Sequence, residues 1–216
     1  MAKLRVVHEA PPTIETAAAE QERIIAAHPE RESFLANFHA QWPLRVADLV
    51  APEHRPAEAT LTPATIALRN WCDELYLDGD GHREIAILSG PVGTGKTTAA
   101  AWVTWHRWPH VDCRHVTARS LVRILRNDDA RTELLDRYAI IVDDLGTELG
   151  DARGQWLADF DELVDELYGS EQRAVFTTNL THKQFKQRYG ERVTDRLSQC
   201  ATWITVKGAS MRGGSK

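Results

Sequence analysis

The sequence has few cysteines, no excess of basic residues and no long apolar run, and each absence excludes a class of protein. The three cysteines, Cys72, Cys113 and Cys200, lack C-x-x-C spacing, so the sequence predicts neither a zinc site nor a disulfide framework. We expect them to be reduced packing residues. The formal net charge of -5 excludes a protein that is one large basic patch, so any contact with nucleic acid must be local.

No stretch is apolar and long enough to cross a membrane, and residues 1–12 lack the apolar centre of a secretion signal. We therefore expect a cytoplasmic protein with no membrane contact. The chain has 216 residues, of which 43% are hydrophobic, and this suits one α/β domain with a modest extension.

The most informative stretch is a glycine-rich loop between an apolar run and a helical pattern. The apolar run Ile85–Leu88 is typical of a buried parallel strand, and the helical pattern begins at Thr97. The loop matches G-x-x-x-x-G-K-[ST] without exception. Its residues are Gly90, Pro91, Val92, Gly93, Thr94, Gly95, Lys96, Thr97 and Thr98.

This loop predicts a nucleotide site. Gly93 and Gly95 allow backbone N–H groups to turn inward around phosphate oxygens, and the following helix adds its partial positive charge. We expect Lys96 to reach the β- and γ-phosphates and the Thr97 hydroxyl to ligate Mg²⁺. The alternative is a surface turn rich in Gly and Pro that happens to contain a lysine.

Two later apolar runs end in polar side chains. Tyr138–Val142 leads into Asp143 and Asp144, and Ala174–Phe176 leads to Asn179. We expect Asp143 to hold the metal on the Thr97 side and Asp144 to orient or activate the attacking water. Asn179 should reach the same carboxyl edge of the sheet and hydrogen-bond the γ-phosphate or the water. The alternative is that the two acids only begin a polar loop.

Residues 1–61 differ from the rest of the chain. Helical patterns occupy Glu15–Ala27 and Glu30–Ala40, and in the second Phe34, Leu35 and Phe38 share a face, with Trp42 nearby. Two interpretations remain open: a helical hairpin packed on the main domain, or a docking module for a partner protein. A further helix is predicted from Thr62, as its cap, to about Leu77.

Two more helical patterns carry aromatic or acidic residues. Trp102, Trp105 and Trp108 recur at helical spacing and are expected in the core. An acidic amphipathic helix is predicted at about 155–168, and we expect its carboxylates to form a solvated face.

Arginines recur on one face of a predicted helix at about 118–126. Arg119, Arg123 and Arg126 fall at i, i+4 and i+7, which suits either contact with a DNA phosphate backbone or a solvated face. Arg192 and Arg196 are likewise spaced i, i+4 and should share a helix face.

Together these motifs resemble the AAA+ ATPases of the DnaC/DnaI-type helicase loaders, and IstB-type transposition helper ATPases are similar. The stretches that carry the resemblance are GPVGTGKT, IIVDDLGTE, TTNL and YGERVTDRL, in this order, within about 62–212. The resemblance implies an α/β fold of the P-loop NTPase type, with a parallel five-stranded sheet between helices and no separate lid domain. It divides the chain into an N-terminal region (1–61), an ATPase domain (62–207) and a basic tail (208–216).

The resemblance also implies roles for single residues. Asp143 and Asp144 match the Walker B pair, Asn179 matches sensor 1, and Arg196 matches an arginine finger, with Arg192 at another subunit-interface position. Arg212 matches a contact of the sensor 2 kind, although Met211 stands where the family has Tyr.

The resemblance implies ATP and Mg²⁺ as cofactors and self-assembly, with the finger acting in trans. The implied function is loading of a hexameric DnaB-type replicative helicase onto single-stranded DNA, with the N-terminal helices docking on the helicase. Two alternatives remain: a transposition helper that acts on duplex DNA with a transposase, and a P-loop kinase acting on a small molecule.

Overall fold

The computed structural model describes residues 36, 38, 40–42, 46, 50, 62–77, 84–106, 108, 112–148, 154–170, 172–208 and 210. Within these ranges five strands form one sheet in the order β2-β3-β4-β1-β5, and every pairing is parallel. The strands are β1 (Ile85–Ser89), β2 (Cys113–Thr117), β3 (Ala139–Leu145), β4 (Arg173–Thr178) and β5 (Ala201–Thr205). The predicted five-stranded parallel sheet is confirmed.

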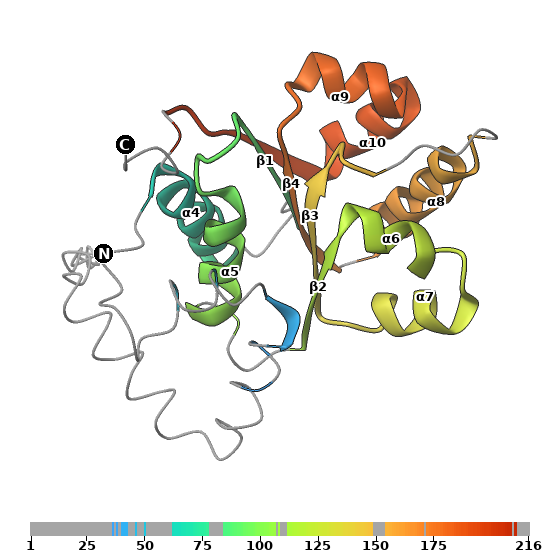
Figure 1. Cartoon of the computed structure of the whole chain (residues 1–216), viewed down its shortest axis with the longest axis horizontal. Coiled ribbons are helices and arrows are strands. Elements are labelled where there is room, and N and C mark those ends of the chain that lie inside the picture. The colour runs from blue at the N-terminus through green and yellow to red at the C-terminus, as the bar shows by residue number, and fades with distance from the viewer. Residues whose placement is uncertain are drawn as a thin grey trace, which may run out of the picture.

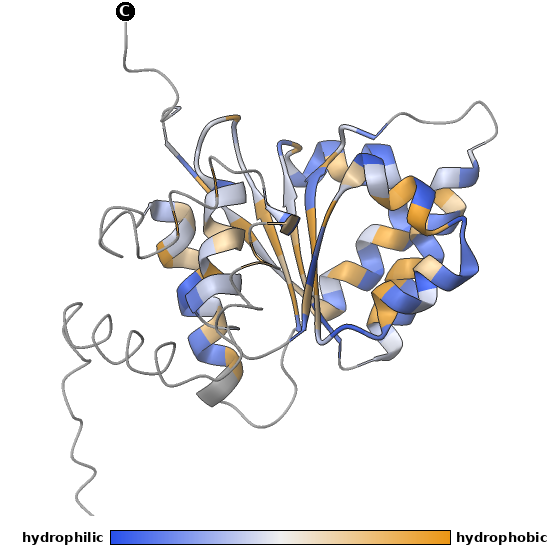
Figure 2. Ribbon diagram, turned by 60° about the horizontal axis from the view of Figure 1, so that its bottom comes forward, coloured by the Kyte–Doolittle hydropathy of each residue, from blue (hydrophilic) through white to orange (hydrophobic). Residues whose placement is uncertain are grey.

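Helices cover both faces of the sheet (Figures 1 and 2). One face carries α4 (Pro63–Leu77) and α5 (Lys96–His106). The other carries α6 (Ala118–Ile124), α7 (Asp128–Leu135), α8 (Gln155–Gly169), α9 (His182–Tyr189) and α10 (Glu191–Cys200). Alternate residues of β1 serve the two cores: Ala86 and Leu88 face α4 and α5, while Ile85 and Ile87 face the opposite side. Burial on both faces explains why the strands are continuous apolar runs.

Side-chain caps set several helix boundaries. Thr62 accepts a hydrogen bond from the Thr65 N–H (3.1 Å), so α4 begins where its cap predicts. The helix predicted at 118–126 ends earlier, at Ile124, because Asn127 caps α7 by accepting from the Ala130 N–H. Helices α7 and α9 were not predicted, since each has only eight residues and few apolar ones.

Three of the described residues before α4, namely Phe38, Trp42 and Val50, are buried in the core that also contains residues of α5. Phe38 is 3% exposed, and its ring meets that of Trp105 edge-on at 4.8 Å. Trp42 is equally buried and stacks on His115 at 4.0 Å. The docking interpretation is therefore wrong for Phe38, which supports the domain core instead. Phe34, Leu35 and the helix predicted at 15–27 lie outside the described residues.

Strand β2 holds the segment before α4 through polar contacts as well. Gln41 accepts from the His115 N–H through its side-chain oxygen (2.9 Å), and its carbonyl oxygen lies 2.8 Å from His115 Nδ1. Burial lowers the pKa of His115, against the opposing influence of Asp143. The imidazole is therefore held neutral at the edge of the sheet.

The remaining core predictions agree with the structure. Trp102, Trp105 and Trp108 are all buried, as the helical spacing predicted. Cys72 and Cys113 are buried free thiols, and Cys200 is a partly buried one. In the described ranges, none of the helices has both the length and the apolar character needed to span a bilayer.

Candidate active site

The strand order brings three polar loops to one edge of the sheet. Strand β4 lies between β1, which leads into the glycine-rich loop, and β3, which ends in the two acids. Residues Thr177 to Asn179 therefore sit between the loop and the acids. In open α/β sheets this carboxyl edge is where ligands bind.

The glycine-rich loop between β1 and α5 has the backbone of an anion cradle. Gly93 and Gly95 both have φ +84°, a conformation that suits glycine and turns N–H groups to one side. A Cβ on Gly90 would lie 2.4 Å from the Val206 carbonyl oxygen, so the loop packs directly on the segment after β5. Thr94 is buried and ties the loop to itself by donating to the Pro91 carbonyl (2.9 Å).

Lys96 is the first residue of α5 and is only 5% exposed. Its ammonium group donates to the carbonyl oxygens of Gly90 and Pro91 and to Asn179 Oδ1, each at 2.8 Å. A buried charge of this kind is stable only when oxygens surround it. Lys96 and Asn179, which are 83 residues apart, therefore meet at one point.

Thr97 and Asp143 form the second convergence. The Thr97 hydroxyl lies 3.0 and 3.1 Å from the two carboxylate oxygens of Asp143, which is buried. Thr177 donates its hydroxyl to the same carboxylate at 2.6 Å. The predicted proximity of Thr97 and Asp143 is thus present, with Thr177 as a third member.

A bulge separates the two acids. Val142 pairs with Phe176 and Leu145 with Thr178, so Asp143 and Asp144 together stand opposite a single residue, Thr177. Asp144 has φ +60°, the only positive φ of a residue other than glycine within the described ranges, and Asp is one of the few residue types that tolerate it. Its N–H donates to the Thr177 hydroxyl at 2.9 Å.

The bulge gives the acids different surroundings. Asp143 is buried against Thr97, whereas the Asp144 side chain is exposed at the sheet edge. The two carboxylates were expected to have different roles, but neither the bulge nor the contact of Thr177 was predicted. The signal for Thr177 was present, since a Thr-Thr pair ends an otherwise apolar strand.

The donor set suits Mg²⁺. The hydroxyl of Thr97 and the carboxylate of Asp143 are hard oxygen ligands, and Mg²⁺ commonly uses one or two such protein groups with water and substrate phosphates. Within the described ranges no cluster of three His, Cys, Asp or Glu side chains could hold a metal by itself. The site therefore fits a metal bound together with a phosphate.

Arg192 and Arg196 lie on α10 and face α8. Arg196 forms ion pairs with Asp161 (3.0 Å) and Asp165, and Arg192 pairs with the same two carboxylates at 3.3 and 3.1 Å. The predicted shared helix face is confirmed. Both guanidinium groups contact acids of their own subunit, and Arg192 is 65% exposed at its side chain.

A solvated acidic face was expected on α8, but arginines pair with most of its carboxylates. The carboxylates involved are Asp159, Asp161, Glu162, Asp165 and Glu166. Periodicity alone could not reveal these pairs, because the arginines come from the turn after α6 and from the helices α7 and α10.

The three arginines expected to track DNA are all exposed. Arg126 pairs with Asp159 at 3.3 Å, and Arg119 Nε donates to the Thr147 carbonyl at 3.3 Å. Arg119 therefore lies beside the loop after β3. Arg123 is exposed on the same helix, so the stripe faces solvent with two of its members held by local contacts.

The other predicted phosphate-loop positions and the tail lie around this cradle. Pro91 and Val92 are exposed, and Thr98 is half-buried in the first turn of α5. Ser210 packs on the loop, since a Cβ on Gly93 would lie 2.1 Å from its hydroxyl oxygen. Arg212 lies outside the described residues.

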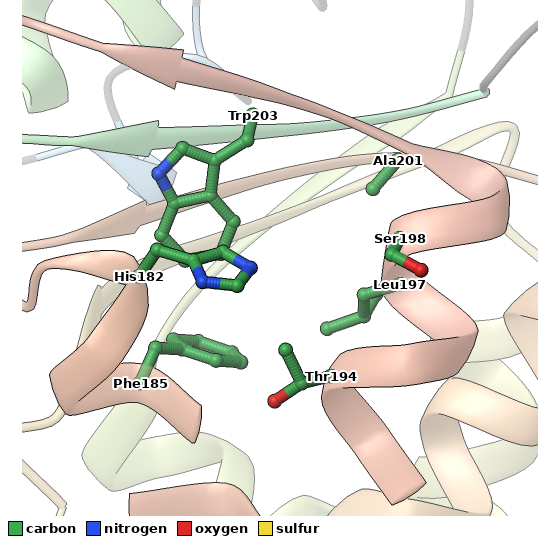
Figure 3. A pocket seen from close by; sticks show the side chains of 7 residues that line it. All are labelled: His182, Phe185, Thr194, Leu197, Ser198, Ala201 and Trp203. Carbon is green, nitrogen blue, oxygen red and sulfur yellow. The ribbon is translucent and has the colours of Figure 1, made fainter. Parts of the chain in front are cut away.

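A separate hollow lies on the far side of α10 from the arginines. It has a volume of about 140 Å³ and lies between α9, α10 and β5 (Figure 3). The rings of Phe185 and Trp203 meet edge-on at 5.3 Å in its wall, and His182 packs on Trp203. Its lining contains none of the phosphate-loop or acidic residues, so it is not part of the candidate site.

Several solved structures have a fold similar to that of this chain. A crystal structure of DnaI matches 67% of this chain and 82% of its own, at 19% identity and a TM-score of 0.55. The DnaC helicase loader matches at 18% identity and a TM-score of 0.55, over 66% of this chain and 89% of its own. Replication initiator DnaA bound to AMPPCP and single-stranded DNA matches at 14% identity and a TM-score of 0.53, over 67% of this chain and 46% of its own.

These identities establish the fold alone. The search of curated proteins finds no match. The profile of one protein family, described as IstB-like ATP binding protein, matches residues 80–216. These residues include the glycine-rich loop, both acids and α10, the helix that carries Arg192 and Arg196. The chain therefore belongs to the IstB-like ATP-binding family.

Proposed function

We propose that this chain binds ATP with Mg²⁺ and hydrolyses it to ADP and phosphate. The observation that carries the proposal is the meeting of Lys96 and Asn179 at the phosphate loop, beside the Thr97–Asp143 pair. The loop N–H groups and Lys96 hold the β- and γ-phosphates, where phosphate oxygens take the place of the oxygens that Lys96 now contacts. Pro91, Val92, Thr94 and Thr98 shape this cradle around Gly90, Gly93 and Gly95.

Thr97 and Asp143 would hold the metal, which when bound would supply positive charge to offset the charge that develops on the β- and γ-phosphates. Thr177 positions the Asp143 carboxylate by donating to it. Asp144, turned outward by the bulge, orients the attacking water or accepts a proton from it, and Asn179 holds the γ-phosphate or that water.

We assign the arginine pair to a neighbouring subunit's site. Arg196 and Arg192 contact α8 of their own subunit and not the phosphate loop of that subunit. An arginine finger supplied in trans would complete a neighbour's site, and such fingers change turnover by about 10³-fold or more. Self-assembly is therefore part of the proposed mechanism, and Arg212 would add a contact from the C-terminal tail.

We further propose that the ATPase loads a hexameric DnaB-type replicative helicase onto single-stranded DNA. The similarity to the fold of DnaI and of the DnaC helicase loader supports this role. The exposed stripe of Arg119, Arg123 and Arg126 would follow the DNA backbone. Phe34, Leu35 and Phe38 were the residues first considered for docking on the helicase. Because Phe38 belongs to the core, we assign this docking to Phe34 and Leu35.

The family assignment favours a second candidate, a transposition helper acting on duplex DNA with a transposase. One experiment separates the two functions. The full chain is mixed with a DnaB-type hexameric helicase and ATP, and co-elution is measured beside binding to single-stranded and duplex DNA. We expect co-elution and a preference for single-stranded DNA.

A double variant with Phe34→Ser and Leu35→Ser should lose co-elution. Leu157→Ser serves as the matched control, because Leu157 is 42% exposed on α8, far along the chain from the N-terminal region. A wild-type chain that ignores the helicase but binds duplex DNA in ATP would overturn the loader role and favour the transposition helper.

A further inference from the structure

Glu148 is a buried acid outside the cluster that the proposed mechanism uses. Its side chain is fully buried, and its carboxylate accepts hydrogen bonds from three different groups. One oxygen accepts from the Gly146 N–H at 2.8 Å. The other accepts from Arg188 Nε at 2.8 Å and from the Tyr189 hydroxyl at 2.7 Å. A buried carboxylate is costly unless it is paired in this way, so these contacts are a fixed part of the structure.

The donors of Glu148 come from two segments that the proposed mechanism needs to hold together. Gly146 is in the turn directly after Asp143 and Asp144 at the end of β3. Arg188 and Tyr189 are the last residues of α9, and Arg188 also donates to the Glu148 carbonyl at 2.9 Å. Glu148 thus joins the acid-bearing end of β3 to the end of α9.

A one-residue junction connects α9 to α10, the helix that carries Arg192 and Arg196 and is called the arginine helix below. Gly190 alone separates the two helices and has φ +90°. Its N–H donates to the Lys186 carbonyl at 3.0 Å, and its carbonyl accepts from the Thr194 hydroxyl at 2.8 Å. The direction of α10 is therefore set by the position in which α9 ends.

Tyr189 is well suited to hold that position. Its ring packs between Phe160 and Phe185, with ring centres 4.8 and 4.4 Å away. Burial, and then the adjacent Glu148 carboxylate, raise the pKa of the phenol. The hydroxyl consequently remains a hydrogen-bond donor throughout the neutral pH range.

We infer that Glu148 is a positioning residue that fixes α10, and with it Arg192 and Arg196, relative to the acids of β3. The residue touches neither of the two arginines nor the Asp143 carboxylate, and acts through Tyr189 and Gly190. This inference rests on the proposed role of Arg196 in a neighbouring subunit's site.

The least disruptive test is Tyr189→Phe, which removes the hydroxyl and keeps the buried ring. Tyr168→Phe is the matched control, because Tyr168 is exposed and its hydroxyl donates to Gln199 of the same helix α10 at 3.0 Å. We expect Tyr189→Phe and Glu148→Gln to lower kcat by about tenfold or more without changing KM for ATP, since small misplacements have effects of this size. The control should match the wild type.

Mixing subunits identifies which side of the interface is affected. Tyr189→Phe mixed with Lys96→Ala should recover activity, because the Lys96→Ala subunit supplies an intact arginine helix to an intact site. Tyr189→Phe mixed with Arg196→Ala should show no recovery above the lowered rates of the two variants alone. The opposite pattern would overturn the inference, because it would mean that Glu148 acts on the acids of its own site. Wild-type kcat in both variants would overturn it as well.

A measurement on the single subunit keeps this inference distinct from the proposed function. If Lys96→Ala mixed with Arg196→Ala fails to recover activity, the trans role of Arg196 is wrong, and amide hydrogen exchange then decides on Glu148. Tyr189→Phe should speed amide exchange in residues 191–196 about tenfold, because it removes one hydrogen bond to a charged group. Exchange in α5 should be unchanged. Unchanged exchange in α10 would overturn the inference.

Discussion

The candidate site has a phosphate-loop side, formed by Lys96, Thr97, Asp143 and Asn179, and an arginine side, formed by Arg192 and Arg196 on α10. The two sides differ in whether their residues meet one another within one subunit. At the phosphate loop, Lys96 contacts Asn179 and Thr97 contacts Asp143, so that residues of α5, of β3 and of the segment after β4 meet. On α10, Arg192 and Arg196 contact only carboxylates of α8 among the ion pairs of the described residues. On the proposed mechanism, nucleotide binding is therefore expected of the single chain, whereas hydrolysis is expected to require a second copy.

The largest effects are expected from two variants that separate ATP binding from ATP hydrolysis. Lys96→Ala should abolish ATP binding, because the loop loses the cation that neutralises the phosphates. Arg196→Ala should keep ATP binding and lower turnover by about 10³-fold. A fluorescent ATP analogue measures binding, and phosphate release measures turnover.

Arg131→Ala is the matched control for Arg196→Ala. Arg131 also pairs with two acids of α8, Glu162 and Glu166, at 2.9 and 2.8 Å, but comes from α7. It should retain full turnover. Equal losses in the two variants would mean that the ion pairs with α8 matter to the fold and that α10 has no special role.

A smaller effect is expected within the phosphate-loop side itself. Thr177→Val removes the hydroxyl that donates to Asp143 and keeps the shape of the side chain. Groups that orient a metal ligand typically change metal affinity by about 10- to 100-fold, so hydrolysis should need correspondingly more Mg²⁺. The measurement is turnover against Mg²⁺ concentration.

Thr104→Val is the control for this change. Thr104 is also buried, and its hydroxyl donates to the Ala100 carbonyl within α5. Identical Mg²⁺ dependence in Thr177→Val and Thr104→Val would show that Thr177 does not position the metal ligand.

The arginine side should tolerate the loss of its acidic partners with little change in stability. Arg196 and Asp165 remain 26% and 34% exposed at their side chains, and exposed ion pairs contribute about 0 to 1 kcal/mol each. The double variant Asp161→Asn and Asp165→Asn should therefore lower the free energy of unfolding by about 1 kcal/mol and keep ATP binding. Urea denaturation gives this value. A loss of several kcal/mol would mean that Arg196 is fixed to α8 and cannot serve a neighbour.

The smallest effect concerns pH and the neutral histidine beside the acids. Burial lowers the pKa of His115 in the folded chain, so the unfolded chain binds more protons once the pH falls below about 6.5. The free energy of unfolding should therefore decrease as the pH falls through that range. Unfolding at pH 8 and at pH 5.5 measures the change, and His115→Asn should flatten it. An unaltered slope in that variant would assign the pH dependence to other groups.

The two sides of the site also differ in how far sequence could predict them. The phosphate loop, Asp143, Asp144 and Asn179 were all identified, because each follows an apolar run and local pattern determines both strand and loop. The partners of Arg192 and Arg196 were missed, since Asp161 and Asp165 lie more than twenty-five positions earlier on another helix. Contacts between distant helices leave no periodic signal.

Two other features escaped the sequence analysis for related reasons. The bulge at Asp144 depends on the register between β3 and β4, which apolar patterns do not specify. Phe38 was considered for partner docking because its helix looked unsupported, yet Trp105 from a distant helix covers it. In both cases contacts between elements that are distant in the sequence determine the structure, and the local sequence pattern does not reveal such contacts.

The most direct test of the account mixes two inactive variants. Lys96→Ala lacks nucleotide binding but keeps its arginine helix, and Arg196→Ala keeps a complete phosphate loop but lacks the finger. ATP hydrolysis is measured for each variant alone and for an equal mixture, with single-stranded DNA present. The account predicts no turnover from either variant and clear recovery in the mixture, because one subunit completes the site of the other. A mixture as inactive as its components, or normal turnover by Arg196→Ala alone, would contradict it.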